Sequence, residues 1–141
     1  MKGRWNGFYK YDKQSIQDRI GVEKTNFTIT IDKFENNYFT GNVEDDLSTK
    51  GSPGIGEISG SISDGKIKFI KQMPIKAIIT LEGKMQTYDE KKHRPIYYEG
   101  VFSNNEKTIK GTWKMKFGIS IVSIFIILLT TKGTWQMDFI E

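Results

Sequence analysis

Hydrophobic and polar residues alternate with a period of two along most of this chain. In Phe27–Asp32 the apolar residues share one face and the polar residues the other, and Thr108–Phe117 follows the same pattern. Because successive side chains of a β-strand point to opposite faces, this alternation predicts a sheet with one dry face and one solvated face.

Turn-forming residues separate the alternating runs at short intervals. Asp64-Gly65 suits a type I′ hairpin turn, and the asparagines of Glu35–Asn37 and Ser103–Glu106 tolerate the same left-handed backbone. Short turns between neighbouring strands predict an antiparallel up-and-down meander. The candidate strands lie near Gly3–Tyr11, Thr25–Lys33, Tyr38–Glu44, Ile55–Ser63, Lys66–Lys71, Lys76–Thr87, Ile96–Ser103, Lys107–Phe117, Ile119–Thr130 and Thr134–Ile140.

One segment departs from the meander. In Ser15–Gly21, Ser15 and Asp18 have the spacing of a helical capping box, Ile16 and Ile20 share one helical face, and Gly21 can end a helix. We therefore expect one short helix directly after the first strand.

A glycine repeat indicates that the sheet is strongly curved. The order apolar-x-Gly-x-apolar occurs at Phe39–Val43, Ile58–Ile62, Tyr98–Phe102 and Ile109–Trp113. Glycine weakens a strand unless the sheet bends there or another group approaches the backbone closely. Its recurrence on the dry face predicts aromatic side chains packed over bare backbone, in an all-β barrel of about eight to ten strands.

A second repeat, Gly-x-Trp, occurs at Gly3–Trp5, Gly111–Trp113 and Gly133–Trp135. The opening Gly-x-Trp, followed by a short helix and a glycine-rich meander, resembles the calycin superfamily of lipocalins, fatty-acid-binding proteins and streptavidin-like barrels. The resemblance implies that Trp5 closes one end of the barrel. Calycins stack a basic residue from the last strand on this tryptophan, and here Lys132 would have to serve.

The composition fits a single domain over residues 1–141. Nine Phe, six Tyr and three Trp supply enough apolar area for one core. The chain has no cysteine, which excludes disulfides, thiolate metal sites and thiol-based catalysis. Because the first strand begins at Gly3, we expect a cytoplasmic protein, or one exported with its signal already removed.

The aromatic residues of the dry face are the candidate ligand-binding residues: Trp5, Tyr9, Phe39, Phe69, Tyr98, Trp113 and Trp135. They fit a filled core, since a barrel of about eight strands is just wide enough for its side chains. They also fit a pocket for one small apolar or aromatic molecule, oriented by the hydroxyls of Tyr9 and Tyr98, with Ser15–Gly21 as a lid. The leading hypothesis is ligand binding. The alternative is a filled barrel that binds proteins through its outer wall or the basic loop Lys91–Arg94.

Few residues point to catalysis or to a bound metal. His93, the single histidine, stands in the cationic run Lys91–Arg94, which predicts a solvated loop rather than a haem ligand or a catalytic base. Glu44-Asp45-Asp46 offers carboxylates to a hard cation, but calcium-loop spacing is missing, so a polar turn is expected. The sequence favours a non-enzymatic protein without a cofactor.

Ile119–Leu129 is apolar almost without interruption. As a helix it would span only about 16 Å, and its β-branched residues favour a strand. If such a strand belongs to the barrel wall, its outer apolar face must pack against another surface to be shielded from water. We therefore expect a homo-oligomer whose interface contains Ile121, Val122, Ile124, Phe125, Ile126 and Leu128. The alternative is a membrane surface, aided by Lys114, Lys116 and Lys132.

The formal net charge of +4 is mildly basic. The lysines are scattered through nearly every segment, as on the solvated face of a sheet, rather than concentrated in one patch. This distribution argues against a nucleic-acid partner.

Overall fold

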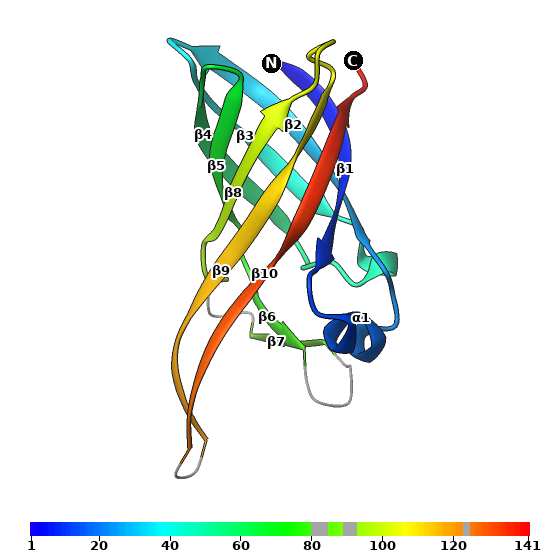
Figure 1. Cartoon of the computed structure of the whole chain (residues 1–141), viewed down its shortest axis with the longest axis vertical. Helices are drawn as coiled ribbons and strands as arrows, with labels where there is room; N and C mark the ends of the chain where they lie inside the picture. Colours follow the sequence, from blue (N-terminus) through cyan, green and yellow to red (C-terminus); the bar gives the residue numbers. More distant parts are fainter. Residues whose placement is uncertain (80–84, 89–92, 123–124) are drawn as a thin grey trace.

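The computed structural model describes residues 1–79, 85–88, 93–122 and 125–141. Eight antiparallel strands close into a barrel in the order β1-β10-β9-β8-β5-β4-β3-β2, and β6 pairs with β7 in a separate hairpin (Figure 1). The strands are β1 (Gly3–Tyr11), β2 (Thr25–Glu35), β3 (Tyr38–Asp45), β4 (Ile55–Ser63), β5 (Lys66–Gln72), β6 (Lys76–Ile79), β7 (Met85–Tyr88), β8 (Ile96–Phe102), β9 (Thr108–Val122) and β10 (Phe125–Phe139). The helices are α1 (Gln14–Ile20) and the short 3₁₀ helix η1 (Leu47–Thr49).

The predicted all-β barrel is confirmed. The alternation along each strand determines which side chains point into the barrel and which point outward. On β9, Ile109, Trp113 and Met115 are buried. Lys110 and Thr112 lie between them in the chain and are exposed. The hydrophobic core therefore fills the interior of the barrel, and the polar residues face solvent.

Two regions of the meander differ from the prediction. The expected strand Lys76–Thr87 is divided into β6 and β7, with residues 80–84 between them outside the described part. The expected strands Lys107–Phe117 and Ile119–Thr130 are also wrong, because β9 continues past Gly118 to Val122 and β10 begins at Phe125. Both errors have one cause. Neither region carries an Asn-Gly, Asp-Gly or Pro turn signal, so residue type alone does not locate the reversal.

Glycines bring aromatic rings close to the backbone, as the repeats predicted. A Cβ on Gly100 would lie 2.7 Å from the indole of Trp135. A Cβ on Gly133 would lie 2.6 Å from Nε1 of Trp113. The missing side chains thus make room for two of the largest groups in the core.

Trp5 is buried near the start of β1. Its ring packs edge-on against Phe139, with centroids 5.2 Å apart, and its Nε1 donates to the carbonyl of Met1 at 3.1 Å. Lys132 does not stack on this ring, because it precedes Gly133, which pairs with Tyr11 at the far end of β1. Lys132 is therefore not the basic residue that the calycin resemblance would stack on Trp5.

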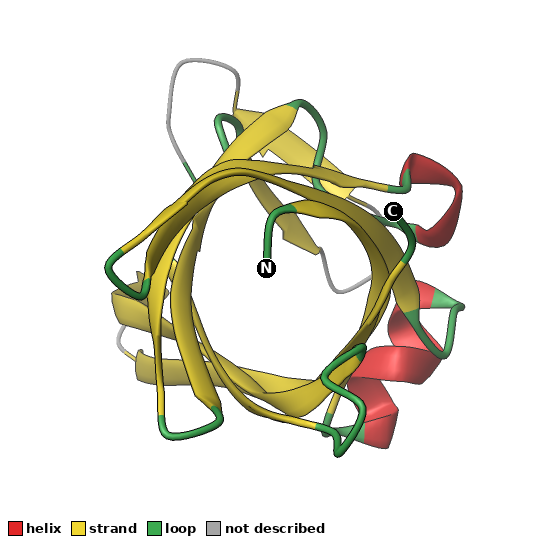
Figure 2. Ribbon diagram, turned by 90° about the horizontal axis from the view of Figure 1, so that it is seen from above, coloured by secondary structure: helices red, strands yellow, loops and turns green. Residues whose placement is uncertain are grey.

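Helix α1 ends as predicted, at Gly21 with φ 83°, and the Gly21 amide donates to the carbonyl of Gln17. The predicted capping box is wrong: the N-cap is Lys13, without a side-chain cap, and Ser15 lies inside the helix. Figure 2 shows the helices outside the ring of strands, so α1 does not lie across the opening as a lid. No described helix has the length and apolar character needed to cross a membrane.

Candidate functional site

A buried ion pair lies inside the barrel, where the alternation of β3 and β5 directs two charged side chains inward. Asp45 shares its face of β3 with the buried residues Phe39 and Val43, and Lys71 shares its face of β5 with Phe69. Lys71 is 1% exposed and Asp45 is 6% exposed. Lys71 Nζ and Asp45 Oδ1 are 2.5 Å apart.

Neighbouring groups compensate both charges. Asp45 Oδ2 accepts hydrogen bonds from the Tyr9 hydroxyl at 3.3 Å and from the Ser52 backbone amide at 3.1 Å. Lys71 Nζ lies 4.9 Å from the ring centroid of Tyr9 and 5.5 Å from that of Phe27. Charge-assisted hydrogen bonds and aromatic faces offset part of the cost of removing the two charges from water.

Three tyrosines surround this ion pair. Burial raises the pKa of Tyr11 to about 12, with a further contribution from the negative charge of Asp45. Burial also raises the pKa of Tyr9 and of Tyr98 well above the usual range, and the Asp45 charge again adds to the effect. Asp45, Lys71, Tyr9, Tyr11 and Tyr98 form what we call the Asp45 cluster, which lies toward the end of the barrel where β1, β3 and β5 finish.

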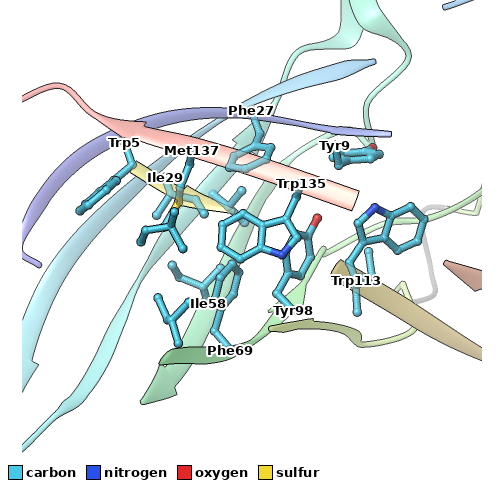
Figure 3. Close-up of a cluster of buried hydrophobic side chains, with 14 of the residues drawn as sticks. Trp5, Tyr9, Phe27, Ile29, Ile58, Phe69, Tyr98, Trp113, Trp135 and Met137 are labelled. Atoms are coloured by element: carbon cyan, nitrogen blue, oxygen red, sulfur yellow. The ribbon is translucent and has the colours of Figure 1, made fainter. Parts of the chain in front are cut away.

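The hydroxyl of Tyr98 is unusual within the cluster. Tyr98 is 2% exposed, yet its hydroxyl makes no hydrogen bond to any described residue. Side-chain N and O atoms that are fully sealed in the described part of the chain all have partners. The hydroxyl must therefore border space that a water molecule can enter. Figure 3 shows it pointing between the indoles of Trp113 and Trp135.

The predicted ligand-binding residues are all buried, but they fall into two groups. Trp113 packs against the rings of Tyr9 and Tyr11, with centroids 5.7 Å and 5.2 Å apart, beside the Asp45 cluster. The others belong to a continuous aromatic packing: Phe39 contacts Phe69, and Phe69 and Tyr98 both contact Trp135. Trp5 lies apart from them, against Phe139. Tyr98 lies opposite Trp113 in the register of β8 and β9.

Both indole N–H groups of the packed tryptophans bond to backbone. Trp113 Nε1 donates to the carbonyl of Lys10 at 3.1 Å. Trp135 Nε1 lies 3.0 Å from the carbonyl of Glu99 and 3.1 Å from that of Thr112. These two polar groups are therefore satisfied by the barrel wall and are not left for a ligand.

The residue-by-residue prediction missed Asp45, Lys71 and Tyr11. The polar turn expected from Glu44-Asp45-Asp46 is correct only for Asp46, whose Oδ1 accepts from the Ser48 amide at 2.9 Å. The Ser48 hydroxyl, which donates to the same oxygen at 2.7 Å, and the Ser48 amide lower the pKa of Asp46. No three of the described His, Asp and Glu residues are grouped so as to hold a metal ion. The alternation along the strands could have identified two of the missed residues. Asp45 lies two residues after the buried Val43, and Lys71 lies two residues after the buried Phe69, so both belong to the inward face of their strands.

His93 does not lie in a solvated loop. It is 7% exposed, its amide donates to the carbonyl of Met73 at 3.2 Å, and its Nδ1 lies 2.9 Å from the carbonyl of Arg94. Gln72 donates to the carbonyl of His93. Lys91 and Lys92 lie outside the described residues. The cationic run thus contains one buried residue, which its neighbours in sequence did not indicate.

The predicted interface residues belong to the ends of β9 and β10 that meet each other. Ile121 pairs with Ile126 and Val122 with Phe125, while Leu128 pairs with Ile119. Ile124 lies outside the described residues. These residues were expected on one strand of the barrel wall, and this expectation is wrong because they are divided between two strands.

The raised tyrosine pKa values predict a loss of stability at high pH. A tyrosine in the unfolded chain ionises near pH ~10, so above this pH the unfolded chain releases protons that the folded protein retains. The free energy of unfolding should therefore be insensitive to these groups below pH ~10 and fall above it, by up to ~1.4 kcal/mol per pH unit for each group. For Tyr11 the window ends at about 12. Denaturant unfolding at stepped pH measures the slope, and Tyr98→Phe should reduce it. An unchanged slope would contradict the raised pKa of Tyr98.

The structure establishes a closed antiparallel barrel of eight strands. Comparison with known proteins adds no family to it. The sequence matches no protein-family model and no curated protein.

Proposed function

We propose that the protein binds a small, mainly apolar or aromatic molecule inside the barrel, next to the Asp45 cluster. The observation that carries this proposal is the hydroxyl of Tyr98, which is buried and has no hydrogen-bond partner among the described residues. Because this hydroxyl borders space that water can enter, a ligand with one polar group would take the place of that water and keep its hydrogen bond.

The surroundings of Tyr98 favour an aromatic ligand. The hydroxyl points between two indoles (Figure 3), whose faces offer large apolar contact area. The charges of Asp45 and Lys71 already neutralise each other at 2.5 Å. An additional net charge would have no counter-ion there, so the proposed ligand is neutral.

The rest of the barrel supports the alternative that part of the interior is filled. Phe39, Phe69 and Trp135 contact one another, and Trp135 Nε1 is bonded to backbone. This packing restricts the proposed site to the region between Tyr98, Trp113 and Tyr9. Phe39, Phe69 and Trp5 then act as structural core residues.

Two matched probes test the proposal: naphthol, which carries a hydroxyl, and naphthalene, which does not. Wild-type protein should bind both, with a preference for naphthol of about tenfold, because one hydrogen bond contributes about 1.4 kcal/mol. Tyr98→Phe should bind both probes equally. Tyr97→Phe is the matched control. Tyr97 directly precedes Tyr98 on β8 but is 38% exposed, so it lies outside the barrel interior and its loss should not change the preference.

Quenching of tryptophan fluorescence and native mass spectrometry report binding independently of each other. If neither probe alters the fluorescence or adds mass at probe concentrations up to their solubility, the proposal is refuted. If both probes bind but Tyr98→Phe keeps the preference for naphthol, the role of Tyr98 is refuted.

A further inference from the structure

β9 and β10 continue beyond the wall of the barrel. The last residue of β9 that pairs with β8 is Met115, and the last residue of β10 that pairs with β1 is Gly133. Farther out, the two strands pair only with each other in the described part of the chain. Figure 1 shows them extending past the ends of the other strands. We call residues 116–122 and 125–131 the ribbon.

The register changes where the ribbon leaves the barrel. Leu128 pairs with Ile119, whereas Thr130 pairs with Lys116, so β9 carries one more residue than β10 between these pairs. Such a bulge bends a strand and increases its twist. The ribbon is thereby set off from the barrel wall as a separate two-stranded unit.

Both strands of the ribbon have an open edge. Within the barrel each strand is paired on two sides, but in the ribbon each has only one partner, so every second residue presents its backbone N–H and C=O outward. Natural edge strands usually carry lysine, proline or a bulge that blocks further pairing. Phe125–Leu129 carries neither lysine nor proline, and the extra residue of the bulge lies in β9 rather than in β10.

A lipid bilayer does not satisfy such an edge. Hydrocarbon offers no hydrogen-bonding partner, and each unpaired backbone group costs several kcal/mol there, so sheets that enter membranes are closed. A second strand satisfies every outward N–H and C=O. Two copies of one strand can pair antiparallel about a two-fold axis, which makes a second copy of the chain a suitable partner.

The two edges are not equivalent. β9 contributes Gly118 and Ser120 to the ribbon, and glycine in particular weakens a strand interior. Phe125–Leu129 of β10 consists only of aromatic, β-branched and leucine residues. We infer that the protein forms a two-fold dimer in which the β10 edges of two ribbons pair antiparallel through residues 125–131. This inference is independent of ligand binding in the barrel.

Sedimentation equilibrium of the full chain tests the dimer. Wild-type protein at micromolar concentration should sediment as a dimer, whereas Ile126→Lys and Ile127→Lys should each sediment with about half that mass, because a lysine on an edge strand opposes pairing with another strand. Ile70→Lys is the matched control: Ile70 lies on the barrel wall, is 40% exposed, and should leave the dimer intact. Near-ultraviolet circular dichroism verifies that each variant keeps its barrel.

Amide hydrogen exchange distinguishes edge pairing from other contacts. Amides of residues 125–131 should gain protection as wild-type concentration rises, and those of β4 should not change. A monomer at all concentrations overturns the inference, as does a dimer that survives both lysine variants. Monomeric protein that floats with anionic vesicles would overturn it in favour of a membrane partner.

Discussion

Replacing Asp45 by asparagine is expected to lower the free energy of unfolding by about 3–5 kcal/mol, because it leaves the Lys71 ammonium buried without a counter-ion. Asparagine has nearly the same shape and keeps an oxygen for Tyr9 and Ser52, so the change removes the charge rather than the packing. Lys71 is 1% exposed and cannot turn toward water without opening the barrel. Denaturant unfolding followed by circular dichroism measures the loss.

Replacing Lys71 instead of Asp45 should lower the free energy of unfolding by a smaller amount. Lys71→Met leaves the Asp45 carboxylate with two donors, the Tyr9 hydroxyl and the Ser52 amide. The double variant Asp45→Asn, Lys71→Met should be more stable than Asp45→Asn alone, because no unpaired charge remains in the core. A double variant that is less stable than both single variants would contradict this account.

The pair between Arg4 and Glu141 provides the control. It has a similar separation, 2.8 Å, but its side chains are 52% and 65% exposed. Water solvates either charge when the other is removed, so Arg4→Met should change the free energy of unfolding by no more than about 1 kcal/mol. Equal losses from Arg4→Met and Asp45→Asn would show that burial does not determine the cost.

Gly133→Ala is expected to destabilise the barrel by about 3 kcal/mol or more. A Cβ at this position would overlap the carbonyl oxygen of Lys10 and lie 2.6 Å from Nε1 of Trp113. The same carbonyl accepts the hydrogen bond of the Trp113 indole at 3.1 Å. A single methyl group would therefore displace a large side chain, remove its hydrogen bond and separate β1 from β10.

Gly65→Ala is the matched control for this substitution. Gly65 has φ 74° in the turn between β4 and β5, and a Cβ there meets no atom within 4 Å. The cost is then only that of the left-handed backbone, about 1 kcal/mol. The midpoint of thermal unfolding compares the two variants, and a Gly133→Ala barrel as stable as that of Gly65→Ala would contradict the described packing.

The periodicity of the sequence was sufficient to predict the barrel. Ile55–Ser63 is the strand β4 with its predicted ends, and the Asp64-Gly65 turn that follows has the positive φ values expected of both residues. The information is local in such a hairpin, because turn residues and alternation fix the register together.

Prediction failed where residue type and position conflict. From its charge alone, Asp45 was predicted to lie in a turn, and Lys71 would be expected on a solvated face. Their positions, two residues after the buried Val43 and Phe69, instead place both side chains inside the barrel. Each charge is tolerable there only because the other is present, on a strand that is 26 residues away in the chain. A pairing of this kind depends on how the sheet closes, and one strand considered alone does not reveal it.

His93 and Trp5 illustrate the same limit. Three neighbouring cations predicted solvent around His93, but its backbone amide is bonded to Met73 beside the end of β5. From the sequence, Lys132 was the basic residue near the last strand that could have stacked on Trp5, but the register places Lys132 at the opposite end of β1. Register between distant strands is a property of the closed barrel, and short motifs do not contain it.

The first strand of the barrel is completed by the last. β1 pairs with β10 from Trp5↔Phe139 to Tyr11↔Gly133, and the Arg4 amide bonds to the carbonyl of Glu141. During synthesis, β1 and β2 leave the ribosome long before β10 exists, so the nascent chain carries an unfinished sheet with one edge of β1 bare. Closure, and with it burial of the Asp45 and Lys71 charges, must wait for the final strand to emerge. Folding of this chain should therefore be slow for its size, since its decisive contacts join strands that are far apart in sequence.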